Sequence, residues 1–249
     1  MKKKTNRLAK TNGEPKSPFG PEVILPKHIV LIPDGNRRWA KERGLPIEEG
    51  HRRGMDNIVE ISRVAQDWGI KYLTIWAFST ENWNRSPREI RYLMRVFKDF
   101  IKKFLREFLK KGVKISHLGR KDRIPKFLRE ALDEAMSKTK NNDKFFVNIA
   151  LDYGGRDEIL RAVKKILSNG PTGKKISEAE FSKYLDTNGQ PEPDLIIRTS
   201  GEKRLSGMMP FQAAYAELYF EKVYLPEFTP YHLKKAILDY SNRQRRFGT

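Results

Sequence analysis

The feature that most constrains the fold of this chain is the alternation of short apolar runs with stretches of helical spacing. Six apolar runs have the length of strands, at residues 28–33, 72–78, 113–118, 145–151, 195–197 and 218–223. Apolar residues recur at helical spacing over residues 54–68, 87–110, 125–138, 157–167 and 230–245. Continuous apolar strands that alternate with helices are typical of a parallel sheet covered on both faces. The sequence therefore predicts a single-domain α/β fold with a central, mostly parallel six-stranded sheet flanked by helices.

The first 26 residues differ from the rest of the chain. They are rich in Lys, Asn, Gly and Pro and show no apolar periodicity, which is typical of a segment without its own core. We therefore predict a mobile basic leader over residues 1–26 and one folded domain over residues 27–249. Residues 168–175 (SNGPTGKK) are predicted to form a loop inside that domain.

The charge of the chain indicates an acidic partner. Lys and Arg number 50 against 31 Asp and Glu, a formal net charge of +19, which suits nucleic acid, an anionic membrane surface or phosphorylated small molecules. The chain has no cysteine, which excludes disulfides, thiolate metal sites and cysteine nucleophiles and is compatible with a reducing cytoplasm. No apolar run approaches the roughly 20 residues of a spanning helix. We expect a cytoplasmic protein that is soluble or peripheral at a membrane.

Polar segments follow four of the predicted strands. In open parallel sheets, ligands bind beyond the carboxyl ends of the strands, so chemistry is expected in the residues that come directly after them. These segments are residues 34–39 (DGNRRW), 79–85 (STENWNR), 152–156 (DYGGR) and 198–206 (RTSGEKRLS).

The turn after the first strand has the composition of an anion site. Gly35 lets the backbone approach a ligand, and the helix start that includes Asn36 offers free N–H groups. Arg37 and Arg38 add donors for phosphate oxygens. Asp34 would oppose a phosphate unless a divalent cation lay between them, which indicates Mg²⁺. The alternative is an ordinary turn in which Asp34 caps a helix.

A second set of basic residues follows the fifth strand. Arg198, Arg204 and Ser206 resemble another anion site, and Gly201 allows a tight bend between them. By itself this segment is equally well explained as a solvated basic loop. Two arginine-bearing loops after two strands of one sheet predict a pair of ligands with separate phosphate groups.

Three further positions have a functional and a structural interpretation. Ser79, Asn82 and Trp83 suit a site that positions a substrate with an apolar body, or a capped turn with a buried Trp. Glu217 is an acid in an apolar stretch, so it should find a metal or an arginine; a structural ion pair is the alternative. His51, after Gly50, lies close in sequence to the first anion turn, although a lone His is more often a capping or packing residue.

Taken together, these segments resemble the cis-prenyltransferase family, which includes the undecaprenyl diphosphate synthases. The resemblance runs from about residue 26 to residue 248, and its motifs occur in the family's order. They are DGNRRWA (34–40), GH (50–51), AFSTENWNR (77–85), YGGR (153–156), DLIIRTSGEKRLS (194–206), AYAELYF (214–220) and RRFG (245–248).

The resemblance implies a fold, a reaction and partners. It implies a homodimeric α/β enzyme with a six-stranded sheet and a hydrophobic tunnel. The implied reaction is the Mg²⁺-dependent condensation of isopentenyl diphosphate with an allylic diphosphate, which yields a cis-polyprenyl diphosphate, the precursor of a glycosyl carrier lipid. A product with a long apolar tail also implies peripheral contact with a membrane.

The resemblance also implies roles for individual residues. Asp34 would hold Mg²⁺ on a diphosphate with help from Glu217, and Ser79 and Asn82 would lie near the proton that leaves. The implied substrate-binding residues are Gly35, Asn36, Arg37, Arg38, Trp39, His51, Trp83, Arg85, Arg198, Arg204, Ser206, Arg246 and Gly248. Of these, Arg246 and Gly248 are expected to reach the site of the partner subunit.

The chain departs from the family pattern at several positions. Ile47 stands where many members carry an arginine, Asp152 stands where Asn is usual, and residues 207–211 (GMMPF) replace a common Asn-Phe-Leu-Leu-Trp. The form DGNRR resembles archaeal and eukaryotic members. Because no cation stands at Ile47, the sequence does not identify the allylic substrate.

Three alternatives to a long-chain synthase remain at this point. A short-chain or atypical condensation is motivated by Ile47 and by the bulky Phe145 and Phe146, which we expect in a strand beside the tunnel. A non-catalytic partner subunit would typically lack the aspartate and arginines that this chain retains. Nucleic-acid binding rests on charge alone, without a recognisable module, so we expect no nucleic-acid partner.

Overall fold

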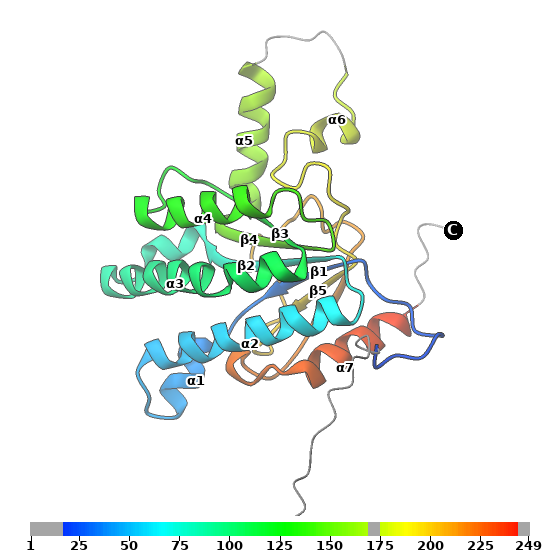
Figure 1. Ribbon diagram of the computed structural model, residues 1–249. Helices are drawn as coiled ribbons and strands as arrows, with labels where there is room; N and C mark the ends of the chain where they lie inside the picture. The colour runs from blue at the N-terminus through cyan, green and yellow to red at the C-terminus, as the bar shows by residue number, and fades with distance from the viewer. Residues whose placement is uncertain (1–16, 169–174, 244–249) are drawn as a thin grey trace, which may run out of the picture.

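The computed structural model describes residues 17–168 and 175–243, and a six-stranded sheet forms its centre (Figure 1). The strands are β1 (His28–Ile32), β2 (Tyr72–Ser79), β3 (Val113–Leu118), β4 (Phe145–Tyr153), β5 (Leu195–Arg198) and β6 (Glu217–Phe220). Their order is β3-β4-β2-β1-β5-β6, and every neighbouring pair is parallel. The predicted α/β class and six-stranded sheet are confirmed, although β6 ends before residue 223.

Helices connect the strands on both faces of the sheet. Among the described residues they are α1 (Asn36–Glu42), α2 (Ile47–Asp67), α3 (Pro87–Lys111), α4 (Lys126–Thr139), α5 (Gly155–Ser168), α6 (Glu178–Ser182) and α7 (Pro230–Ser241), with 3₁₀ helices η1 (Thr80–Asn84) and η2 (Leu225–Glu227). The predicted helix start at Asn36 is confirmed by α1, α6 was not predicted, and α7 ends at Ser241 instead of residue 245. Figure 1 shows α5 rising away from the sheet toward α6.

The start of α2 differs most from the prediction, because the helix begins at Ile47 instead of residue 54. Two glycines in its first half, Gly50 and Gly54, weaken the helical pattern of the sequence. In the structure, Glu48 and Glu49 occupy the first turn, where negative charge interacts favourably with the helix dipole. The longer helix includes the Gly-His motif, whereas the sequence pattern places this motif just before the helix.

The central strand β1 is buried over its whole length and sends side chains into two cores. Ile29 and Leu31 pack with α2 and α3 on one face, whereas Val30 packs with Met208 and Met209 on the other. A parallel sheet with both faces covered has this pattern. Both methionines are fully buried, so the segment in which the chain departs from the family covers the second face of the sheet.

Two residues of the predicted leader, Phe19 and Ile24, contact the domain. Phe19 meets the ring of Trp68 edge-on, with 5.4 Å between the ring centroids. The backbone N–H of Ile24 donates a hydrogen bond to Ser241 Oγ at 2.9 Å. Residues 1–16 and most of the predicted loop at 168–175 lie outside the described residues.

A buried polar network lies on the central strands. His28 is fully buried; its Nδ1 lies 2.8 Å from the carbonyl oxygen of Pro191 and its Nε2 2.8 Å from Thr74 Oγ1. Asn148 Nδ2 donates to Thr74 Oγ1 and to Gln190 Oε1, at 2.9 and 2.6 Å. A neutral imidazole satisfies both neighbours of His28, with Nδ1 as donor and Nε2 as acceptor. Burial lowers the pKa of His28.

This network predicts that the protein loses stability on acidification. The pKa of folded His28 lies below its ordinary value of 6.5, so the unfolded chain binds the proton more readily, and stability falls as the pH drops below that value. We expect the free energy of unfolding, measured in urea, to fall between about pH 7 and about pH 5.

The variant His28→Leu separates the effect of His28 protonation on stability from the effects of the other titratable groups. It should lower the free energy of unfolding by about 1–3 kcal/mol at neutral pH, because two buried groups lose a partner. Its stability should depend less on pH than that of the wild type. His51 and His117, whose pKa values are also lowered by burial, keep part of the slope. An unchanged slope in the variant would contradict the account.

Candidate active site

An apolar cavity of about 360 Å³ opens at the carboxyl ends of β1, β2, β4 and β5. Helices α2 and α3 form its walls, and the sheet forms its floor. Its apolar lining includes Met55, Ile58, Ile75, Ala77, Leu93, Val96, Phe97, Phe100, Ile101, Ile149, Leu151 and Leu225. Its polar lining comprises Asp34, Asn36, His51, Ser79, Glu81, Asn82, Arg85, Arg198 and Ser206. The cavity has the character of the predicted hydrophobic tunnel.

A second cavity of about 550 Å³ adjoins the first and is rich in cations. The two share Pro33, Asp34, Asn36, His51 and Arg85. The second is also lined by Gly35, Arg37, Arg38, Lys41, Leu45 and Ile47. A cationic compartment therefore leads into an apolar one, an arrangement suited to a ligand with an anionic head and a hydrocarbon tail. The apolar side chain of Ile47 lies in the cationic compartment itself.

Two glycines let the backbone form this junction. Gly35 has a φ of +100°, and a Cβ there would lie 2.4 Å from Tyr224 Cδ1. A Cβ at Gly50 would lie 2.2 Å from the carbonyl oxygen of Asn36. Only glycine fits at either position. The close approach of α2 to the start of α1 brings His51 beside the first anion turn.

Asp34 lies between two arginines, Arg38 of α1 and Arg198 at the end of β5. Arg198 Nη2 donates to Asp34 Oδ2 at 2.9 Å, and Arg38 Nη2 donates to Oδ1 at 3.0 Å. Burial alone would raise the pKa of Asp34, but the hydrogen bonds and charges of Arg198 and Arg38 outweigh it and lower the pKa below its ordinary value. Thr199 Oγ1 also accepts from the backbone N–H of Asp34. The ionised carboxylate thus joins the ends of β1 and β5.

The second predicted anion loop is built around Arg198. This guanidinium is nearly buried and donates to Ser206 Oγ at 2.8 Å and to the carbonyl oxygen of Arg204. Arg204 does not line either cavity; its guanidinium pairs with Glu202, which also accepts from Arg38 Nη1 at 2.8 Å. Glu202 therefore links the two arginine loops. Sequence reasoning missed it, although it lies inside the motif between Arg198 and Arg204.

Glu89 in the first turn of α3 is a second residue that sequence reasoning missed. Its Oε1 lies 3.0 Å from Arg85 Nη1, 3.4 Å from His51 Nε2 and 3.9 Å from Arg37 Nε. Burial and the charge of Arg85 lower the pKa of His51, so the imidazole is neutral near pH 7. The predicted diphosphate residues Arg37, His51 and Arg85 are thus held together by one carboxylate.

Ser79 and Asn82 line the mouth of the apolar cavity and also cap η1. The backbone N–H of Ser79 donates to Asn82 Oδ1 at 3.1 Å, and the Ser79 side chain accepts in return from the backbone of Asn82. The structural alternative of a capped turn is therefore correct for both residues. It does not exclude a functional role, because both side chains remain at the cavity wall.

The two predicted substrate-binding tryptophans do not line either cavity. Trp39 of α1 is buried against η2. Its Nε1 donates to Glu227 Oε1 at 3.1 Å, and the guanidinium of Arg43 lies over its ring. Trp83 Nε1 donates to Asp152 Oδ1 at 2.9 Å. Their predicted contact with substrate stays a prediction.

Glu217 lies far from Asp34 within one chain. It begins β6 opposite Leu195, at the amino ends of the strands, whereas Asp34 follows the carboxyl end of β1. The expectation was that Glu217 finds a metal or an arginine, and Arg243 Nη1 donates to its Oε2 at 2.7 Å. Within residues 17–168 and 175–243, no three His, Asp or Glu side chains gather in a way that could hold a metal ion. Arg246 and Gly248 lie outside these residues.

The chain has close relatives of known sequence. Over residues 32–248 it matches the family described as putative undecaprenyl diphosphate synthase. It is 44% identical over 228 residues to an isoprenyl transferase of Bacillus anthracis, covering 90% of this chain and 88% of that protein. It is 45% identical over 228 residues to the (2E,6E)-farnesyl-diphosphate specific ditrans,polycis-undecaprenyl-diphosphate synthase of Micrococcus luteus, covering 90% and 92%.

Solved structures agree with these relatives. Lavandulyl diphosphate synthase from Lavandula x intermedia, solved in complex with dimethylallyl diphosphate, has a TM-score of 0.86 at 38% identity and covers 90% of this chain and 99% of that one. A probable undecaprenyl diphosphate synthase from Campylobacter jejuni has a TM-score of 0.76 at 31% identity, with the same coverages.

A parallel α/β sheet, a cationic compartment that leads into an apolar cavity and these relatives together indicate an enzyme of prenyl transfer. The chain belongs to the cis-prenyltransferase family, that of the undecaprenyl diphosphate synthases. The order of motifs in the sequence correctly indicated this family.

Proposed function

We propose that the protein condenses isopentenyl diphosphate with an allylic diphosphate and forms a cis-polyprenyl diphosphate, the precursor of a glycosyl carrier lipid. The observation that carries this proposal is Asp34, which joins Arg38 and Arg198 at the point where the cationic and apolar cavities meet. Two arginine loops on either side of one carboxylate suit two diphosphates. The apolar cavity suits the hydrocarbon of the growing chain.

The allylic diphosphate is assigned to the cationic cavity. Arg37, Arg38, Lys41 and Arg85 supply positive charge there, and neutral His51 supplies a hydrogen-bonding nitrogen. Cations near the diphosphate stabilise the negative charge that it gains as the allylic C–O bond breaks. The hydrocarbon tail would extend into the apolar cavity, which excludes water from the allylic cation.

Isopentenyl diphosphate is assigned to the loop of Arg198, Arg204 and Ser206. Its double bond attacks the allylic carbon as the allylic C–O bond breaks and the diphosphate leaves. The cation that forms then loses a proton from the carbon beside the cationic centre to an oxygen of the departing diphosphate, and the electrons of that C–H bond form the new double bond. Ser79 and Asn82 at the cavity wall would lie beside the reacting carbon and orient it. Glu202 would exchange its arginine contacts for those of the diphosphate.

Asp34 is the residue that fits Mg²⁺. Its ionised carboxylate reaches both cavities, and Mg²⁺ is usually held by one or two carboxylates together with substrate phosphates. When bound, Mg²⁺ neutralises charge on the diphosphate and thereby assists its departure. A role for Glu217 stays a prediction, because its carboxylate lies at the other end of the sheet and pairs with Arg243.

Incubation with labelled isopentenyl diphosphate, Mg²⁺ and a panel of allylic diphosphates tests the proposal. Asp34→Ala should lower kcat/KM by about 100- to 1,000-fold. Arg38 and Arg198 lose the negative charge between them, and the Mg²⁺ on the diphosphate loses the carboxylate that holds it. Arg204→Ala should mainly raise the KM for isopentenyl diphosphate. Asp99→Ala, at an exposed site on α3, is the matched control.

The starter panel runs from dimethylallyl to geranylgeranyl diphosphate. Folded wild-type protein that forms no product with any starter would falsify the proposal. The same result would leave the non-catalytic partner subunit as the better interpretation, although the retained Asp34, Arg198 and Arg204 speak against it.

A short-chain or atypical condensation is a second candidate, and two observations favour it. Ile47 lines the cationic cavity where many members carry an arginine, and a structural neighbour, lavandulyl diphosphate synthase, was solved with dimethylallyl diphosphate. Phe145 does not line the apolar cavity as we had expected. It is buried in the core, on the same face of β4 as Ile149, which does line the cavity. Phe145 thus packs in the core beyond the cavity floor.

This position predicts a difference between two neighbouring phenylalanines. Phe145→Ala should lengthen the prenyl product, because it extends the apolar cavity along β4. Phe146→Ala should leave product length unchanged, because Phe146 lies on the other face and stacks on Tyr72 with 4.5 Å between centroids. Chromatography of the products measures both. Equal product lengths for wild type and Phe145→Ala would remove Phe145 from the argument.

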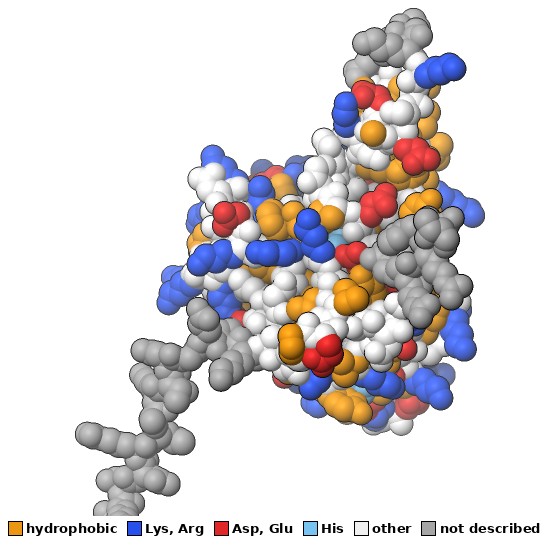
Figure 2. Space-filling view, turned by 90° about the vertical axis from the view of Figure 1, so that its right-hand side faces the viewer, with side chains coloured by type: hydrophobic (Ala, Val, Ile, Leu, Met, Phe, Trp, Pro, Cys, Tyr) orange, Lys and Arg blue, Asp and Glu red, His pale blue; other side chains and the backbone are white. Residues whose placement is uncertain are grey.

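We further propose that two copies of the chain form a homodimer through α5. Leu160, Val163 and Leu167 follow each other at helical spacing on α5 and are 61, 39 and 72% exposed. Figure 2 shows hydrophobic side chains, interspersed with charged ones, on the part of the molecule that projects at the top and contains α5 and α6. An apolar stripe of this kind on a folded protein marks an interaction surface.

The dimer is tested by the mass of the protein in solution. Sedimentation equilibrium should give twice the chain mass for the wild type, and Leu160→Glu with Leu167→Glu should shift the protein toward monomer. Leu238→Glu, at an exposed position on α7, is the control. A dimer that survives the double substitution would place the interface elsewhere.

Peripheral membrane contact stays a prediction. None of the described helices has both the length and the apolar composition to cross a bilayer. The outer side of α3 carries exposed Arg91, Arg95, Lys102 and Arg106, which suit an anionic lipid surface. Co-sedimentation with anionic and with neutral vesicles tests this contact, and equal binding to both would count against it.

A further inference from the structure

The carboxylate of Asp152 is fully buried at the end of β4, outside both cavities. Its φ of +54° places it in the left-handed region, which non-glycine residues seldom adopt. This is also the position where Asn is usual in the family. A buried carboxylate needs charged and hydrogen-bonding partners, so the partners of Asp152 indicate what this departure does.

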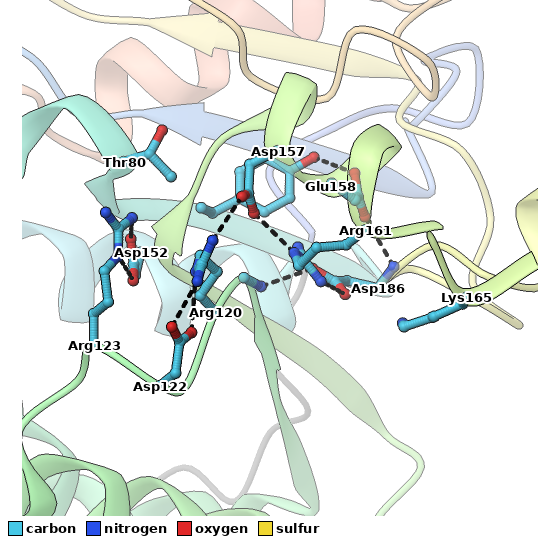
Figure 3. A network of polar contacts seen from close by, with 12 residues as sticks. Thr80, Arg120, Asp122, Arg123, Asp152, Asp157, Glu158, Arg161, Lys165 and Asp186 are labelled. Carbon is cyan, nitrogen blue, oxygen red and sulfur yellow. Dashed lines mark hydrogen bonds and ion pairs between the residues drawn. The ribbon is translucent and has the colours of Figure 1, made fainter. Parts of the chain in front are cut away.

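Asp152 has two partners, and each comes from a neighbouring strand end. Arg123, in the loop between β3 and α4, donates from Nε to Asp152 Oδ2 at 2.9 Å and from Nη2 to Oδ1 (Figure 3). Trp83 of η1, which follows β2, donates from Nε1 to Oδ1 at 2.9 Å. Strands β3, β4 and β2 are adjacent in the sheet. The three residues therefore form one connection along its carboxyl edge, which we call the Asp152 clamp.

The clamp holds the indole ring of Trp83 from two further sides. The guanidinium of Arg123 lies over the ring, 5.5 Å from its centroid. Phe78 meets the ring edge-on, with 5.2 Å between centroids. Hydrogen bond, cation and aromatic contact together leave the indole one orientation, so Trp83 anchors η1 to β4.

The residues beside Trp83 in η1 line the apolar cavity. Asn82 and Glu81 line the apolar cavity, and Ser79 at the start of η1 does so too. The charge of Arg123 reaches this segment: burial would raise the pKa of Glu81, but local hydrogen bonds and the charge of Arg123 lower it. The clamp thus fixes the segment that carries the cavity wall without contacting the cavity itself.

We propose that Arg123 and Asp152 are positioning residues for the condensation, which act through Trp83 to hold Ser79 and Asn82 in place. This inference rests on the proposed function, which places those two side chains beside the reacting carbon. A displacement of about 1 Å at such a wall costs up to about 100-fold in rate. The clamp therefore controls kcat, whereas the cationic cavity for the allylic diphosphate lies elsewhere.

The identity of residue 152 follows from the presence of Arg123. Trp83 and Arg123 together bring three N–H donors to the side chain, and a carboxylate accepts all of them. An amide at 152 could accept from Trp83, but its NH₂ group would face a donor of Arg123. Asp152→Asn and Arg123→Ala should therefore each impair the clamp, and the double variant should be less impaired than the sum of the two.

Steady-state kinetics with isopentenyl diphosphate and an accepted allylic starter test the proposal. Arg123→Ala and Arg123→Gln should lower kcat by about tenfold or more, with little change in the KM for the allylic diphosphate. Lys126→Ala, which removes a neighbouring exposed cation, is the matched control. Arg123→Ala with the kcat of this control would overturn the proposal, as would additive losses in the double variant.

Fluorine NMR of fluorotryptophan-labelled protein supplies a readout that is independent of activity. The chain has four tryptophans, and Trp83→Phe assigns the relevant resonance. We expect Arg123→Ala to shift the Trp83 resonance and leave the other three in place, and the double variant to restore part of the shift. An unmoved Trp83 resonance would overturn the clamp. If the wild type makes no product, the proposed function fails, while this spectrum still decides whether the clamp exists.

Discussion

The arrangement of the site depends on one carboxylate, that of Asp34, shared between Arg38 and Arg198. Arginines that bind diphosphates repel each other when they lie close together, and an ionised carboxylate between them offsets that repulsion. Asp34 can do so because β1 and β5 are adjacent and parallel, so that their carboxyl ends meet. The buried central strand β1 therefore sets the position of the charge, and the charge sets the distance between the two loops.

The same logic recurs at the other anchors of the site. Glu89 gathers Arg85, His51 and Arg37, and Glu202 links Arg38 to Arg204. Each acid fixes cations that would otherwise be flexible and mutually repulsive. The excess of positive charge in the composition is thus partly organised by a few carboxylates at the mouth of an apolar cavity. Much of the rest lies on solvent-facing surfaces such as the outer side of α3.

The strands and the basic loops were predictable, because apolar runs such as that of β1 and clusters such as Arg37 and Arg38 are local features of the sequence. The start of α2 was not, since Gly50 and Gly54 weaken the local pattern while packing against Asn36 requires them. The directions of Trp39 and Trp83, and the pairing of Glu217 with Arg243, could not be predicted either. Each depends on a partner distant in sequence. For the same reason the roles of Glu89, Glu202 and Arg123 emerged only from the fold.

The most direct test of this account is a crystal structure of the protein with Mg²⁺ and unreactive analogues of both substrates. We expect two diphosphates on either side of Asp34, one on Arg37 and Arg38 and the other on Arg198 and Arg204. We also expect the allylic hydrocarbon in the cavity between α2, α3 and the sheet. Diphosphates bound away from Asp34, or a hydrocarbon tail outside that cavity, would contradict the central claim.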